Sequence, residues 1–568
     1  MKKLFFLITF TFFLFFFLLT TPSHAKQMNI LVHPFENTGE GYSWISAGMT
    51  DTVISDLMRV RNISVISNAD RKKIIEEMKF ILSGLAAEEA MLKVGKLMGA
   101  DVIFTGSYLV SGNEIRVNAR LINVETGKVE ASAKIDGIIE KIFALQDKVV
   151  FTLMGETEKI TIADIKPVKF TSEDKKKIVE KLKPKLTAYE WYAKGLEVQD
   201  TNPKEALTNF KKALDIDPDY TDALMSAGFT AGNTLNLFNK ALGYLEKAER
   251  IFKSRNETKS AGYASLMMNI GVVYENKGQL DRALEYYLNS QSIMDRLGLQ
   301  NTAGYTRLMM NIGNVYWNKG QLDRALEYYL NCQSIKDRLV LQNTADYASL
   351  MNNIGIVYAN KGQLDRALEY FLNSQSLRDR LGLQNTAGYA TLMNCIGNVY
   401  GRKGQLDRAL EYYLNSQSIY DRLGLQNTAG YALLMMNIGI VYWNKGQLDR
   451  ALEYYMNSQS IYDRLGLQNT AGYADLMNNI GIVYRNKGQL DRALEYCLKD
   501  KSIEDRLGLQ NTAGYAMLMF NMASLYEKKG QRDMAGRYYR MAYDTFVRTD
   551  YSGESRDRAL KNARRLGY

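Results

Sequence analysis

The hydrophobic and polar positions of this sequence repeat every 42 residues across residues 258–546. Each copy contains the segment Gly-Gln-Leu-Asp-Arg-Ala-Leu-Glu-Tyr or a close variant of it. Its leading glycine lies at Gly278, Gly320, Gly362, Gly404, Gly446, Gly488 and, in a copy that has drifted, Gly530. A fixed period of about 20 to 50 residues is typical of solenoids, in which each unit packs only on its neighbours. The pattern therefore predicts a stacked repeat array.

Within one copy, the apolar spacing predicts two amphipathic helices. Helix A is expected from Ala303 to Asn318 and helix B from Gln321 to Arg338, and Leu339–Thr344 connects to the next copy. The last proline is Pro218, so the 42-residue copies contain none of the residue that lacks a backbone N–H donor and breaks helices. Gly313 recurs in helix A of other copies, which predicts that helix B crosses there without room for a Cβ. The expected core positions are Leu308, Met309, Ile312, Tyr316, Leu322, Ala325, Leu326, Tyr329 and Ile335.

Residues 26–160 show a different pattern, in which short apolar runs alternate with helical spacing. Such alternation predicts a small α/β domain. Its strands are expected at 28–35, 63–66 and 101–108, followed by a hairpin of 114–121 and 128–135. Its helices are expected at 43–60, 69–81, 86–97 and 138–154.

Between the two regions, residues 161–187 indicate a linker with one short polar helix. Residues 188–222 follow, with Ala206, Phe210, Ala213 and Pro218 at the spacings of the 34-residue tetratricopeptide repeat, which they resemble. Residues 223–257 indicate an eroded repeat, 258–546 seven 42-residue repeats, and 547–568 a C-terminal capping helix. The 42-residue copies resemble the tetratricopeptide repeats of kinesin light chain. The expected fold is an α/β N-terminal domain followed by an all-α tetratricopeptide (helix-turn-helix) right-handed superhelical solenoid, and the resemblance implies a groove that binds protein or peptide.

Three segments of the N-terminal domain resemble the domain shared by curli-secretion lipoproteins and proteins described as TolB-like. These segments are Ile30–Asn37, Gly99–Ser107 and Arg120–Gly127. The resemblance implies a non-catalytic domain, periplasmic or outer-membrane associated, that mediates assembly. The chain lacks the acylated N-terminal cysteine of that family and its long hairpin insertions, so pore formation is not carried over.

Residues 1–25 have the features of a secretory signal peptide. A basic start precedes an apolar run at Leu4–Leu19, and small residues stand before a cleavage point after Ala25. The alternative is an uncleaved N-terminal anchor, although 16 apolar residues fall short of the roughly 20 that span a bilayer. No later segment is expected to cross a membrane. The sequence therefore predicts export, with the protein periplasmic or outer-membrane associated.

Composition argues against several kinds of chemistry. The formal charge of +10 is spread without a basic block, so nucleic acid is not an expected partner. Cys332, Cys395 and Cys497 occupy three unrelated repeat positions, and outside the leader the sequence has one histidine, His33. No phosphate-binding glycine motif follows a strand. We therefore expect no catalytic residues, no cofactor, no metal and no enzyme activity.

The candidate site comes from comparing the copies of helix A with one another. Asparagine recurs at one position, broken by Cys395, and again seven residues further on, although it is a poor helix former. Its amide can both donate to and accept from an extended peptide backbone. The alternatives are that these amides cap neighbouring helices, or that copying preserved them. The predicted groove residues are Asn269, Asn311, Asn353, Asn437, Asn479, Asn521, Asn276, Asn318, Asn360, Asn444 and Asn486, with Trp317, Trp443 and Arg485 as anchors for selectivity.

Three further positions on helix A vary between copies and are expected on the same face. The first runs from Ser265 and Arg307 to Met517, the second from Val272 and Asn314 to Ser524, and the third from Glu275 and Trp317 to Glu527. The leading hypothesis is a non-enzymatic exported scaffold that binds protein or peptide in the concave groove, with its N-terminal domain docking to an envelope component. The alternative is a structural subunit of an outer-membrane secretion or assembly complex.

Overall fold

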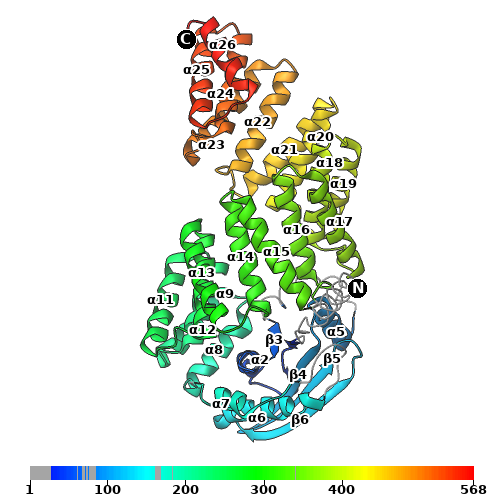
Figure 1. The fold of residues 1–568 in the computed structure, drawn as a ribbon, viewed down its shortest axis with the longest axis vertical. Helices are drawn as coiled ribbons and strands as arrows, with labels where there is room; N and C mark the ends of the chain where they lie inside the picture. Colours follow the sequence, from blue (N-terminus) through cyan, green and yellow to red (C-terminus); the bar gives the residue numbers. More distant parts are fainter. Residues whose placement is uncertain are drawn as a thin grey trace, which may run out of the picture. The chain divides into compact units, whose positions relative to one another are not determined.

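The computed structural model describes residues 27–60, 62–66, 71, 75, 85–159, 168–181, 183–339 and 341–568. The chain forms two compact units, which divide between Lys361 and Gly362. The first unit contains the N-terminal sheet and the repeats up to Lys361, and the second contains the remaining repeats (Figure 1). The leader and most of the helix expected at 69–81 lie outside the described residues.

The sheet of the first unit has the strand order β3-β1-β4-β5-β6. Its strands are β1 (Met28–Val32), β3 (Ile63–Ile66), β4 (Val102–Ser111), β5 (Glu114–Asn123) and β6 (Val129–Ile138). β1 is fully buried and pairs in parallel with β3 and β4, as expected of an apolar run covered on both faces. β5 alternates buried and exposed residues and pairs antiparallel with β4 and β6. A two-residue strand that the sequence did not predict, β2 (Glu36–Asn37), pairs with β4.

Three described helices accompany this sheet, namely α2 (Trp44–Leu57), α5 (Ala87–Leu97) and α6 (Ile142–Gly155). α2 and α6 contact each other as well as the sheet, and α5 contacts β4. The expected helices at 43–60, 86–97 and 138–154 are thus confirmed, apart from a short 3-10 turn before α6. This part of the chain is the α/β domain that the sequence predicted, and it is called the sheet domain below.

The predicted linker contains the expected short helix, α7 (Ser172–Val179), whose first turn is closed by a capping box of Thr171 and Asp174. The residues after α7 are tied to the sheet domain. Lys181 forms an ion pair with the fully buried Asp56, and Lys183 Nζ lies 2.7 Å from Asp147 Oδ2. The described part of the linker is therefore packed on the sheet domain.

The two segments predicted as the first repeats differ from the 42-residue copies. The first pairs α8 (Leu186–Val198) with α9 (Pro203–Ile216), and a Cβ at Gly195 would collide with the Phe210 ring. The segment predicted as an eroded repeat contains α10 (Thr221–Phe229), a π-helical turn and α11 (Phe238–Ser254).

The helix pairs of the 42-residue repeats follow the predicted bounds within one residue. The first unit contains α12 (Ala261–Asn276), α13 (Leu280–Arg296), α14 (Ala303–Asn318), α15 (Leu322–Arg338) and α16 (Ala345–Asn360). The second contains α17 (Leu364–Arg380), α18 (Ala387–Arg402), α19 (Leu406–Arg422), α20 (Ala429–Asn444), α21 (Leu448–Arg464), α22 (Ala471–Asn486), α23 (Leu490–Leu507), α24 (Ala513–Lys528) and α25 (Arg532–Arg548). A further helix, α26 (Glu554–Arg565), follows these pairs within the segment predicted as a C-terminal helix.

Local chemistry explains where these helices begin and end. Thr302 caps α14 by accepting from Tyr305 N at 3.2 Å, and threonines cap α16, α18, α20, α22 and α24 in the same way. After α14 the chain turns at Gly320, whose φ of +70° suits glycine. A Cβ at Gly313 would lie 2.5 Å from the ring of Tyr329, which confirms the predicted close crossing of helix B.

Adjacent repeats are joined by a regular ion pair. The lysine after helix A pairs with the first-turn aspartate of the preceding helix B, as in Lys319–Asp281, Lys361–Asp323, Lys403–Asp365, Lys445–Asp407, Lys487–Asp449 and Lys529–Asp491. These aspartates are exposed, so each pair contributes at most about 1 kcal/mol. Searched across the described ranges, the chain contains no helix with the length and apolar character of a transmembrane span.

Candidate peptide-binding face on the A helices

The first asparagine position lies at the boundary between the core and the surface of helix A. Asn269, Asn311, Asn353, Asn479 and Asn521 are half-buried, and Asn437 is 9% exposed. Two of these amides have side-chain partners. Asn437 Nδ2 donates to Asn394 Oδ1 at 3.0 Å, and Asn521 Oδ1 accepts from Arg485 Nη1 at 3.4 Å. Part of the predicted hydrogen-bonding capacity is therefore already used inside the repeats.

The second asparagine position is the last residue of helix A. Asn276, Asn318, Asn360, Asn444 and Asn486 end α12, α14, α16, α20 and α22 respectively, and all five are exposed. Asn276 Nδ2 donates to Asn233 Oδ1 of the preceding repeat at 3.0 Å. At the end of a helix the low helix propensity of asparagine costs little free energy. The location therefore gives a structural reason for these asparagines, in addition to the predicted role in binding.

The three predicted anchors differ in exposure. Trp317 is 38% exposed, whereas Trp443 and Arg485 are half-buried. Arg485 is engaged with Asn521, which orients its guanidinium. The binding role of all these residues stays a prediction.

Two of the variable positions of helix A have an internal partner that the sequence comparison missed. Tyr329 Oη donates to Asn314 Oδ1, and Tyr413 Oη donates to Asn398 Oδ1, each at 2.6 Å. Where the second variable position is not asparagine, the third can supply the acceptor, as in Tyr287 with Glu275 at 2.7 Å and Tyr539 with Glu527 at 3.0 Å. Part of the variation on helix A therefore follows the needs of a buried tyrosine hydroxyl on helix B.

A signal for this pairing was present in the sequence. The helix B position reads Tyr287, Tyr329, Phe371, Tyr413, Tyr455, Cys497 and Tyr539. Phenylalanine occurs in the copy whose variable residues are Ile356 and Ala359, which have no side-chain acceptor. Reading the two helices of each copy together would have revealed the link.

Cys395 interrupts the first asparagine position on this face. Burial raises the pKa of the Cys395 thiol to about 12, so it is an uncharged replacement for the asparagine of that position. All three cysteines are free. His33 is in the sheet domain, where burial and the charge of Arg71 lower its pKa to about 4. Within the part of the chain that the structure describes, no group of three His, Cys, Asp or Glu side chains could hold a metal ion.

Comparisons with known proteins agree on the repeats. Tetratricopeptide repeat families match residues 264–293, 305–380, 346–422, 388–464, 430–499 and 518–545. Residues 264–545 therefore contain tetratricopeptide repeats, and the chain combines a mixed-sheet N-terminal region with a tetratricopeptide array. The predicted signal peptide and the resemblance to curli-secretion proteins stay predictions.

A curated relative and several solved structures are also similar to parts of the chain. "Putative adenylate cyclase 3" of Rhizobium meliloti (strain 1021) is 25% identical over 244 residues, which are 40% of this chain and 38% of that protein. The structure of BtubC from P. vanneervenii is 18% identical; the match covers 44% of this chain and 91% of the BtubC chain, with a TM-score of 0.30. The apo form of RapI is 15% identical, with 64% of this chain and 98% of the RapI chain covered and a TM-score of 0.43. A putative kinesin light chain of Podosopora anserina is 14% identical, with 36% of this chain and 98% of that chain covered and a TM-score of 0.32.

Proposed function

We propose that this protein is a non-enzymatic scaffold that binds a protein or extended peptide along the A helices of its repeat array. The observation that carries the proposal is the recurrence of half-buried amides at equivalent places on successive A helices. In solenoids, stacking repeats with a small rotation creates an extended concave surface suited to a long partner. Amides at a regular interval along such a surface would bind the backbone of an extended segment, and Trp317, Trp443 and Arg485 would contact its side chains.

The groove is tested most sharply inside the second unit. In-cell crosslinking and mass spectrometry first identify the partner, whose affinity is then measured by calorimetry. Replacing Asn437, Asn479 and Asn521 together by alanine removes three amides. At about 0.5–1.5 kcal/mol each, this loss should weaken binding roughly tenfold to a thousandfold.

The chain offers a matched control on helix B. Asn373, Asn415 and Asn457 are exposed asparagines in the same unit, and alanine at all three should leave the affinity unchanged. Equal affinities for the two triple variants, with both forms folded by circular dichroism, would contradict the groove.

We further propose that the protein is exported and that its sheet domain docks to an envelope component. The apolar leader and the three segments similar to curli-secretion proteins support this proposal. Fractionation of cells that express the chain should place it in the envelope. Light scattering after gel filtration tests the alternative of an assembly subunit, because a monomer would argue against a ring.

The name of the curated relative defines a test of the non-enzymatic proposal. That match covers 38% of the relative, and cyclase activity has no candidate residues among those considered above. Incubating the purified chain with ATP and Mg²⁺ should yield no cyclic AMP above a heat-denatured control. Steady formation of cyclic AMP would overturn the proposal.

A further inference from the structure

One copy in the second unit carries three acidic side chains that no other copy has at the same positions. Asp475 belongs to α22, and Asp500 and Glu504 lie one turn apart on α23. Elsewhere the Asp475 position is serine, arginine, threonine, leucine or methionine, and the Asp500 position is serine, cysteine or alanine. The Glu504 position is methionine, lysine, arginine, tyrosine or phenylalanine. Asp475, Asp500 and Glu504 are called the acid cluster below.

Copies with serine at the Asp500 position show where this side chain points. Ser458 Oγ donates to the carbonyl oxygen of Ala432 at 2.7 Å, across the two helices of its copy. The residue after Ala432 stands at the Asp475 position, so Asp500 points toward the turn of α22 that carries Asp475. In agreement, the charge of Asp475 helps to raise the pKa of Asp500, and the Asp500 side chain is only 3% exposed.

Glu504 approaches the same turn from the next position along α23. In another copy, Thr391 and Tyr420 stand at the Asp475 and Glu504 positions, and their hydroxyl oxygens lie 3.3 Å apart. A Cβ at Gly514 of α24 would lie 4.0 Å from Glu504 Oε1, so Glu504 is located between α22 and α24. Glu504 is half-buried and Asp475 is exposed. The acid cluster therefore extends from the surface to the buried Asp500.

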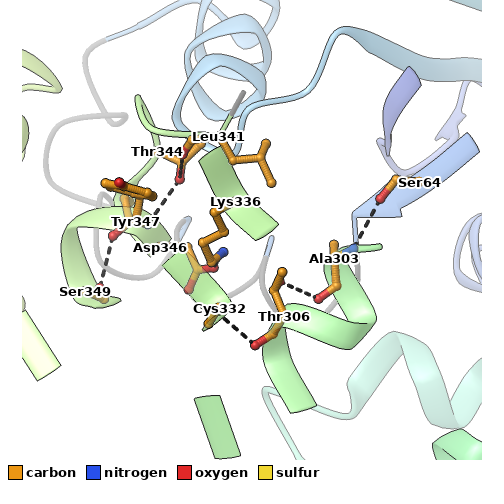
Figure 2. Close-up of polar contacts among 11 residues, drawn as sticks. Ser64, Ala303, Thr306, Cys332, Lys336, Leu341, Thr344, Asp346, Tyr347 and Ser349 are labelled. Carbon is orange, nitrogen blue, oxygen red and sulfur yellow. Dashed lines mark hydrogen bonds and ion pairs between the residues drawn. The ribbon is translucent and has the colours of Figure 1, made fainter. Parts of the chain in front are cut away.

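Another copy contains its own counter-charge at the Glu504 position. There the residue is Lys336, which is 3% exposed and forms an ion pair with Asp346 (Figure 2). In the copy of the acid cluster, the residue equivalent to Asp346 is Gly514. The structure describes every residue from 362 to 568, and within this range no lysine, arginine or histidine forms an ion pair with the acid cluster. The second unit thus leaves these three acids without a cation of their own.

The unpaired acids are unfavourable in their charged form. Asp500 Oδ1 and Glu504 Oε2 are buried and accept no hydrogen bond. Burial and the charges of neighbouring acids raise the pKa of Asp500 to about 8 and that of Glu504 to about 7. Lys501, the residue after Asp500, is engaged with Asp505 at 2.6 Å. Buried oxygen atoms without a partner are uncommon in folded proteins, and a bound cation is one arrangement that satisfies them.

The arrangement suits an extended organic cation better than a metal ion. Among the residues that the structure describes, no three His, Cys, Asp or Glu side chains are grouped so that they could hold a metal ion. A guanidinium is planar, stays charged and has five N–H donors, so it can bind more than one carboxylate. The apolar stem of an arginine can also lie along a protein surface while its charged head reaches a group further in.

We propose that the acid cluster binds an arginine side chain, and that this arginine belongs to the protein or peptide that lies along the A helices. Asp475 meets the guanidinium at the surface, and the carboxyls of Asp500 and Glu504 accept from it further in. The second half of the proposal rests on the proposed function, because Asp475 stands at a variable position of helix A. The binding of arginine by the cluster does not depend on it.

Saturation-transfer NMR of the full chain with N-acetyl-L-arginine amide tests the cluster before any partner is known. N-acetyl-L-citrulline amide is the matched probe, because it has nearly the same shape and no charge. The cluster variant carries the residues that the preceding copy has at these positions, where they fold, namely Asp475→Leu, Asp500→Ser and Glu504→Tyr. The control variant removes three charges from exposed glutamates of the same unit, namely Glu369→Gln, Glu411→Gln and Glu453→Gln.

The original chain and the control variant should bind the arginine probe equally, and the cluster variant at least about tenfold more weakly. Glu504→Gln alone, the mildest change, should weaken binding about threefold or more. The citrulline probe should not bind. Equal binding of arginine by the original chain and the cluster variant, or of arginine and citrulline by the original chain, would overturn the proposal, as would no detectable binding of arginine.

The acid cluster and the asparagine groove can fail separately. If the cluster binds the arginine probe while the asparagine variant keeps full affinity for the partner, the cluster stands and the groove does not. If the asparagine variant loses affinity while the cluster variant binds arginine as well as the original chain does, the groove stands and the cluster does not. Circular dichroism spectra equal to that of the original chain show that each variant is folded.

Discussion

At the scale of single residues, the helix B tyrosine shows how the copies differ in a coordinated way. Its hydroxyl is buried, and a buried donor without an acceptor costs free energy. Asn314, Asn398, Glu275 and Glu527 meet this need from two different positions of helix A. Variation that looks like adaptation to a ligand is therefore, at these residues, adaptation to a neighbouring side chain.

A matched pair of substitutions tests this explanation. Tyr413→Phe removes a donor to Asn398 and should lower the free energy of unfolding by about 0.5–1.5 kcal/mol. In the copy that contains Tyr455, the second and third variable positions of helix A are Ile440 and Trp443. Neither side chain can accept a hydrogen bond as the amide oxygen of Asn398 does. Tyr455→Phe should be neutral or slightly stabilising. Urea unfolding of both variants gives the comparison, and an equal loss in the two would contradict it.

A buried carboxyl creates a second test at this scale. Ser290, Ser416 and Ser458 each donate to a carbonyl oxygen of helix A, and Asp500 takes their position in the next copy. Asp500 is 3% exposed. Burial, helped by the charges of Glu504 and Asp475, raises the pKa of Asp500 to about 8.

The pH dependence follows from this raised pKa. Between about pH 4 and pH 8 the unfolded chain releases the Asp500 proton while the folded chain keeps it, so stability falls as pH rises through this window. Asp500→Ser should raise the Tm, with a small gain at pH 5 and a larger one at pH 8. Ser458→Asp should do the reverse in a neighbouring copy. A gain from Asp500→Ser that is the same at both pH values would argue against a protonated carboxyl.

At the scale of secondary structure, two glycines of α18 have opposite reasons for being there. A Cβ at Gly397 would lie 2.5 Å from the Tyr413 ring, whereas a Cβ at Gly401 would be 3.8 Å from Ala409, an ordinary contact. The first glycine is required by packing and the second is a cost in helix propensity.

Alanine at each position separates these roles. Gly397→Ala should destabilise the second unit by about 1–3 kcal/mol, because the Tyr413 ring must move. Gly401→Ala should stabilise it by about 0.5–1 kcal/mol. Thermal unfolding by circular dichroism measures both, and a shift of the same sign in the two variants would refute the crossing as the cause.

At the scale of the whole molecule, the sheet domain and the first repeat are joined through the segment predicted as a linker. Lys181 comes from that segment and pairs with Asp56 of α2, which has no exposure to solvent. Burial raises the pKa of Asp56 to about 6 although Lys181 opposes the rise. The ion pair with Lys181 therefore favours the negatively charged form of the buried Asp56 carboxyl, whereas burial alone favours the protonated form.

Lys181→Ala should lower the free energy of unfolding of the first unit by about 3 kcal/mol, because Asp56 loses its partner. Without the lysine the pKa of Asp56 rises further, so the loss should be larger at pH 8 than at pH 5, where the carboxyl takes up a proton. Lys176→Ala on α7 is the control, since that lysine is exposed and its ion pair is with the exposed Glu180. Equal effects of the two variants at pH 8 would contradict a buried pair.

The sequence by itself determined the fold class and, within one residue, the ends of the 42-residue helices. It could do so because period, caps and glycines are local signals, and copies such as Ala303–Asn318 and Ala429–Asn444 repeat them. It also determined that Gly313 must meet a crossing helix. Only the tertiary structure decided that Tyr329 bonds to Asn314, that Lys181 reaches Asp56 and that Gly99 lies against Thr344. The first contact joins the two helices of one copy, and its signal appears only when the copies are compared with one another. The last two join residues more than a hundred positions apart, so no local pattern encodes them.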